Sequence, residues 1–71
     1  MNGPNRENPF TALYLFLKGE TEAGEGIRLQ ATGELNGDTE TVEVGELRYQ
    51  RGLKLMDEAT ELGKQIRQTK T

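Results

Sequence analysis

The chain has 71 residues, of which 32% are hydrophobic and 30% are charged, with a net charge of −3. This length makes one small domain, near the lower limit at which a hydrophobic core holds a fold together unaided. Cysteine and histidine are both missing, which excludes a disulfide framework, a zinc finger and the commonest general base. We therefore expect a cytoplasmic protein that is not an enzyme and holds no cofactor.

The chain begins with a polar stretch, residues 1–8, that contains Gly, Pro and three Asn. Such a composition has nothing to bury and predicts a flexible N-terminal arm. The folded domain is then expected over residues 9–69. The longest apolar run within it has six residues, 12–17. This run is far too short to cross a bilayer, so no membrane partner is expected.

Residues 9–18, PFTALYLFLK, form the most apolar segment, and two structures fit them. A strand places Tyr14 and Phe16 on one face and the three leucines on the other. A helix has Asn8 as its N-cap and Pro9 in its first turn. Periodicity does not separate the two in so short a run. We favour the strand, because the segment is aromatic and because a third strand would give a sheet independent stability.

The dipeptide Asn36-Gly37 predicts a two-residue β-hairpin turn, since both central residues of a type I′ turn need a positive φ. The flanking stretches 27–35 and 38–44 alternate in register around it. Pairing them across the turn gathers their apolar residues on one face. The preceding residues 19–26 carry three glycines and three glutamates and are expected to form a turn or acidic loop.

From residue 46 to about residue 68 the pattern becomes helical, with apolar residues at i, i+4, i+7 and i+11: Leu55, Ala59, Leu62 and Ile66. Gly52 and Gly63 interrupt it, either to let the helix approach a neighbour closely or as a kink. The predicted fold is α+β: a three-stranded antiparallel β-meander followed by one long C-terminal α-helix packed on one sheet face. Its predicted core combines Leu29, Val44, Leu55 and Leu62.

Protein binding is the function that this arrangement favours. Aromatic residues on the sheet face opposite the helix would have nothing to cover them, and exposed aromatic clusters mark interfaces. The candidate binding residues are Tyr14, Phe16 and Phe10. We expect an accessory subunit, adaptor or inhibitor of another protein. A small core also favours self-association into a homo-oligomer.

Nucleic-acid binding is the alternative. Residues 20–46 hold eight acidic residues against one basic, a net charge of −7, whereas residues 47–71 hold six basic against three acidic, a net of +3. Basic residues in the second region recur every three positions and could follow a phosphate backbone. The candidate contacts are Arg48, Arg51, Lys54, Lys64, Arg67 and Lys70.

Overall fold

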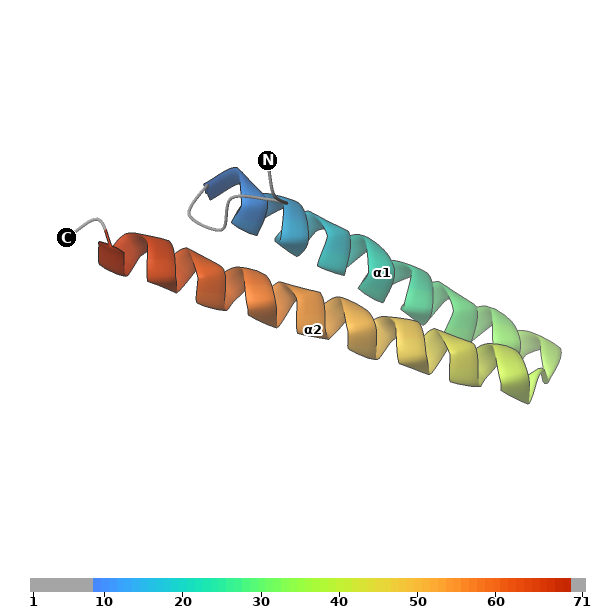
Figure 1. The fold of residues 1–71 in the computed structure, drawn as a ribbon. Coiled ribbons are helices and arrows are strands. Elements are labelled where there is room, and N and C mark those ends of the chain that lie inside the picture. The colour runs from blue at the N-terminus through green and yellow to red at the C-terminus, as the bar shows by residue number, and fades with distance from the viewer. Residues whose placement is uncertain (1–8, 70–71) are drawn as a thin grey trace, which may run out of the picture.

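The computed structural model describes residues 9–69, which form two long antiparallel helices joined by a tight turn (Figure 1). Helix α1 covers Pro9–Asn36 and helix α2 covers Thr39–Thr69. The predicted α+β fold is therefore wrong: the described residues contain no strand and form a helical hairpin. Neither helix, within that range, combines the length and apolar character that a membrane crossing requires. The predicted arm and Lys70 lie outside the described residues.

The N-terminal half of the chain departs most from the predicted sheet. Residues 9–18 adopt the helical alternative, with Pro9 as the first residue of α1. Proline suits that position because the first helical N–H has no partner within the helix. Residues 19–26, predicted to be a loop, continue the same helix, and so do residues 27–35, predicted to be a strand.

The Asn-Gly dipeptide does mark a reversal of the chain, but it joins helices. Gly37 has φ = 66°, the left-handed conformation typical of the residue after a helix end. Its N–H donates to the carbonyl of Glu34 (3.3 Å), and the N–H of Asp38 donates to the carbonyl of Gly33 (2.7 Å). These two bonds form a Schellman motif, which satisfies carbonyls that the end of α1 leaves without helical partners.

Asp38 ends this turn and caps the second helix. Its carboxylate accepts hydrogen bonds from the N–H of Thr41 (3.3 Å) and from the Thr41 hydroxyl (2.7 Å). Its own carbonyl accepts the first helical bond, from Val42 (3.2 Å). Asp38 is thus the N-cap of α2, which begins at the next residue, Thr39.

The helices meet along a line of residues spaced seven apart, all of them glycine or alanine except the last, which we call the seam. The seam consists of Ala12, Gly19, Gly26 and Gly33 in α1 and of Gly45, Gly52, Ala59 and Ile66 in α2. A Cβ atom built on Gly26 would lie 2.5 Å from both the Gly45 carbonyl oxygen and the Tyr49 nitrogen. A Cβ on Gly19 would lie 2.7 Å from the Gly52 carbonyl oxygen. Backbone therefore packs directly on backbone.

The seam leaves little room for a hydrophobic core. The buried apolar residues are Ala23, Ala59, Leu62 and Ile66, and no large side chain among the described residues is fully buried. The predicted core is correct for Leu62, which is 2% exposed, and wrong for Val44, which is 51% exposed. Leu29 and Leu55 are half-buried. The two larger buried side chains lie in the C-terminal half of α2, where the seam no longer contains glycine.

Candidate protein-binding surface

The outward sides of the two helices differ in polarity. A residue two positions before a seam residue is rotated by about 200° and therefore points outward. In α2 these positions are polar: Glu43, Gln50, Asp57 and Lys64. In α1 they are apolar or small: Phe10, Leu17, Gly24 and Ala31. The outward side of α2 is typical of a solvated helix, whereas that of α1 is not.

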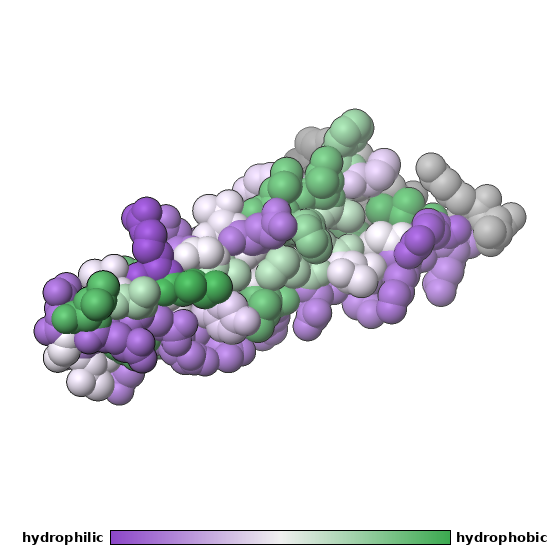
Figure 2. Space-filling view, turned by 180° about the vertical axis from the view of Figure 1, so that it is seen from behind, coloured by the Kyte–Doolittle hydropathy of each residue, from purple (hydrophilic) through white to green (hydrophobic). Residues whose placement is uncertain are grey.

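We define the outer face of α1 as this column together with its apolar neighbours Leu13, Tyr14, Ile27 and Leu35. Its exposed fractions are high: 73% for Phe10, 60% for Tyr14, and just over half for Leu13 and Leu17. Figure 2 shows apolar side chains gathered on the half of the molecule toward the chain ends. At roughly 200 Å² for a bulky side chain, the exposed apolar area of residues 10–17 is about 500 Å². A patch of this size matches the largest apolar patch of a typical monomeric protein, and such patches are often functional.

The structure places the predicted aromatic residues on α1 but not on one face. Phe10 and Tyr14 are one helical turn apart on the outer face. Phe16 lies two residues beyond Tyr14, about 200° around the helix, and is 39% exposed. The Lys18 ammonium lies 5.9 Å from the centre of the Tyr14 ring. The strand interpretation placed Leu13 and Leu17 on the sheet face opposite Tyr14, so it did not include them in this surface.

Gly24 is the one outward glycine of α1. The other three glycines of that helix have the backbone of α2 against them, but a Cβ built on Gly24 would meet nothing within 4 Å. Glycine in a helix interior lowers stability by about 1 kcal/mol relative to alanine. Contact with α2 explains the seam glycines, and no contact among residues 9–69 explains Gly24.

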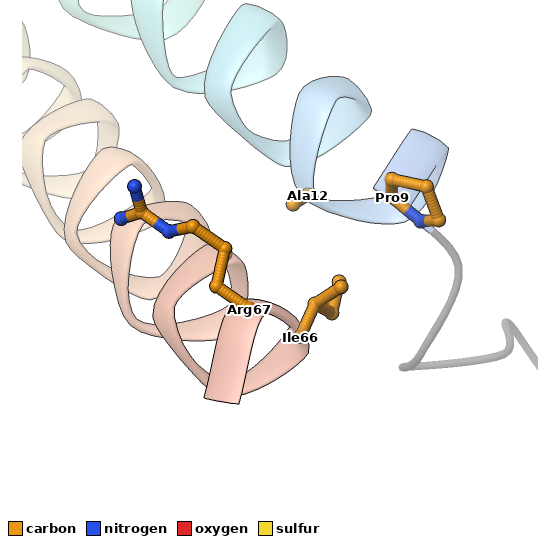
Figure 3. A pocket seen from close by; sticks show the side chains of 5 residues that line it. Pro9, Ala12, Ile66 and Arg67 are labelled. Atoms are coloured by element: carbon orange, nitrogen blue, oxygen red, sulfur yellow. The ribbon is translucent and has the colours of Figure 1, made fainter. Parts of the chain in front are cut away.

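A hollow of about 310 Å³ lies between the open ends of the two helices (Figure 3). Pro9 and Ala12 line it from α1, and Gly63, Ile66 and Arg67 line it from α2. Among residues 9–69, Arg67 is the one charged residue of this lining. It is an apolar notch next to the outer face of α1.

The predicted nucleic-acid contacts do not gather on one side of α2. Each step of three residues falls about 60° short of a full turn, so the basic rows wind around the helix. Lys64 lies 3.7 Å from Glu61, and Arg48 is paired across the hairpin. Arg51 and Lys54 are exposed, and Arg67 borders the hollow.

Two polar contacts join the helices beside the seam. The Arg48 Nε donates to a carboxylate oxygen of Glu22 at 3.1 Å. The Gln30 amide donates to the carboxylate of Glu46 at 2.7 Å. The bond from Arg48 holds the pKa of Glu22 below its ordinary value, and the same bond raises the pKa of Arg48. Hydrogen bonds from Thr41 likewise lower the pKa of the capping Asp38.

These lowered pKa values predict a hairpin that weakens in acid. A carboxyl whose pKa is depressed by folding contributes its full stabilisation above the unfolded value of about 4, and loses it as the pH falls through the folded value. We expect the thermal unfolding midpoint, followed by circular dichroism, to fall between pH 6 and pH 3. Glu22→Gln should unfold at a lower temperature at pH 6 and show a smaller fall. The exposed control Glu43→Gln should keep the full fall, and an equally large fall in Glu22→Gln would contradict the role of the pair.

Comparison with known protein families, with curated proteins and with solved structures found no match for this chain. Among the described residues no three carboxylates gather where they could hold a metal ion. The outer face of α1 is the candidate functional surface because it exposes large apolar side chains over residues 10–17.

Proposed function

We propose that this protein is a non-enzymatic protein-binding module, an accessory subunit, adaptor or inhibitor, that binds through the outer face of α1. The supporting observation is the contrast between the outward columns of the two helices. The outward column of α2 is polar, whereas that of α1 consists of phenylalanine, leucine, glycine and alanine. An amphipathic helix with two such faces packs one on its own hairpin and offers the other to a partner.

The energetics of the hairpin support the same proposal. Four residues make up the buried apolar core, and two of them are alanines. A domain of this size gains stability when it buries further apolar surface against another protein. A sequence without cysteine or histidine also lacks the usual nucleophile and base, which fits a binding protein and a reducing compartment such as the cytoplasm.

Substitution of the outer face tests the proposal. Leu13→Ser/Leu17→Ser should leave the helical content unchanged, because both side chains are about half exposed and lie outside the seam. The same double variant should abolish capture of the proteins that the tagged wild type retains from its host. Quantitative mass spectrometry of the retained proteins provides the measurement.

Two control variants complete this experiment. Leu47→Ser replaces a leucine of α2 that is 66% exposed, and should retain the captured proteins. Arg51→Glu/Lys54→Glu reverses two exposed basic residues, and should retain them as well. Capture that survives Leu13→Ser/Leu17→Ser, or that fails in the charge variant, would contradict binding through the outer face.

A further inference from the structure

The outer face of α1 combines three features that together specify its occupant: an apolar column, a glycine at its centre, and charges of opposite sign on either side of that glycine. Gly24 lies fourteen residues after Phe10 and eleven before Leu35, near the middle of the helix. Glu20 lies four residues before it and Arg28 four residues after it. A surface arranged in this way is complementary to itself when one copy is reversed against the other.

We propose that a second copy of this chain covers the outer face of α1, with the two α1 helices antiparallel and the two Gly24 residues at the two-fold axis. This inference rests on the proposed function, because it names the protein that the outer face binds. Leu17 of one copy then lies level with Ala31 of the other, and Leu13 lies level with Leu35. Within the central column the large Leu17 is thus opposite the small Ala31, as close helix packing requires.

Charge favours this orientation over a parallel one. In the antiparallel pair each Glu20 is level with Arg28 of the other copy, whereas a parallel pair would place like charges level with each other. The distribution of charge along the whole hairpin also favours the antiparallel orientation. Residues 25–47, on the turn side of Gly24, carry six acidic residues against Arg28 alone, a net charge of −5. Residues 9–23 and 48–69, on the open side, carry six basic residues against five acidic, a net charge of +1. Antiparallel pairing brings these ends of opposite charge together.

The available area is sufficient for such a pair. Residues 10–17 of two copies supply about 1,000 Å² of exposed apolar surface, on the basis of roughly 200 Å² for each bulky side chain. Ile27, Ala31 and Leu35 extend the contact along the rest of the helix. Specific protein interfaces bury about 1,200–2,000 Å² in total. The glycine at the axis has a role in this arrangement, since it lets the two backbones approach as they do along the seam.

Disulfide trapping tests the position of the axis, because the wild-type chain has no cysteine. Facing Cα atoms at the axis fall within the reach of a disulfide. Gly24→Cys should therefore form a covalent dimer on mild oxidation. Leu17→Cys should not, because its two copies would be about 21 Å apart along the helix. An equimolar mixture of Leu17→Cys and Ala31→Cys should cross-link between the two variants.

Charge reversal tests the orientation. Glu20→Arg and Arg28→Glu, each alone, should raise the dissociation constant of the dimer about tenfold, because each replaces two opposite-charge pairs by two like-charge pairs. The combined Glu20→Arg/Arg28→Glu variant should restore the wild-type value. Light scattering behind a sizing column, over a range of protein concentrations, measures the dissociation constants of the single and combined variants. Cross-linking of Leu17→Cys with itself as readily as Gly24→Cys would overturn the antiparallel arrangement.

The experiment separates this inference from the proposed function. A mass of 7.9 kDa for the purified wild type at high micromolar concentration would exclude the second copy. The proposed function would still hold if Leu13→Ser/Leu17→Ser then lost the captured host proteins. A dimer whose mass is unaffected by Leu13→Ser/Leu17→Ser would overturn the inference as well, because its interface would lie elsewhere.

Discussion

Gly26→Ala is expected to lower the free energy of unfolding by up to about 2 kcal/mol, because overpacking usually costs about 1–3 kcal/mol and the helix propensity of alanine offsets about 1 kcal/mol of that cost. The added methyl group would lie 2.5 Å from a carbonyl oxygen and a backbone nitrogen of α2. Backbone cannot rotate aside as the end of a flexible side chain can, so the helices must separate. This cost should exceed the gain of about 1 kcal/mol that alanine has over glycine in a helix. Urea unfolding followed by circular dichroism, at one fixed protein concentration, measures the difference.

Gly63→Ala is the matched control, because it makes the same substitution in a helix where nothing lies within 4 Å of the new atom. It should raise the free energy of unfolding by up to about 1 kcal/mol, from helix propensity alone. The two variants are therefore expected to differ in sign. Stabilisation by both would mean that the helices do not touch at the seam in solution.

Leu62→Ala should have the other large effect, a loss of about 2–5 kcal/mol, as for other leucines removed from a core. Leu62 is 2% exposed, the least among the buried apolar residues. Few other large side chains are buried between the helices. Without Leu62, the open end of the hairpin should therefore separate first during unfolding. Urea unfolding again provides the measurement.

Leu47→Ala controls for the change in helix propensity and side-chain size. Leu47 lies on the same helix and is 66% exposed. Its replacement should alter the free energy of unfolding by no more than about 0.5 kcal/mol. Equal effects of the two substitutions would show that the interior of the hairpin does not depend on Leu62.

The sequence predicted the position of the chain reversal and the helical character of residues 46–68, but it did not predict the partner of that helix. Asn36-Gly37 favours a positive φ, and both a β-hairpin and a Schellman motif use one. The choice between them depends on the flanking residues. Local alternation over residues 27–44 supported strands, whereas the contact with α2 that stabilises the helix is not visible in a short window.

The glycines misled the interpretation most. Within a short window, Gly19, Gly24 and Gly26 resemble a loop, because glycine lowers helix stability. The role of Gly19 and Gly26 becomes clear from a spacing of seven residues. This spacing links Gly19, Gly26 and Gly33, and it recurs at Gly45 and Gly52. Such a repeat returns to one side of a helix and is typical of two helices in close contact. This signal was present in the sequence and was missed.

The candidate surface was predicted in part. Phe10 and Tyr14 are exposed on the outer face of α1, although the reason given for their exposure, a sheet with one uncovered side, was wrong. Leu13 and Leu17 could not be recognised as surface residues while the segment was treated as a strand, because alternation placed them opposite Tyr14. Only the direction of the seam shows which side of α1 points outward.

The backbone contact along the seam also limits which amino acid substitutions this protein can tolerate. A buried leucine has near equivalents in isoleucine and methionine, so a mutation there can be mild. A glycine has none, because every other amino acid brings at least a Cβ atom. Five of the 71 positions, Gly19, Gly26, Gly33, Gly45 and Gly52, are therefore closed to all nineteen alternatives unless the opposite helix moves. Substitutions that leave the hairpin intact are expected instead on the outward column of α2, whose side chains are polar and exposed.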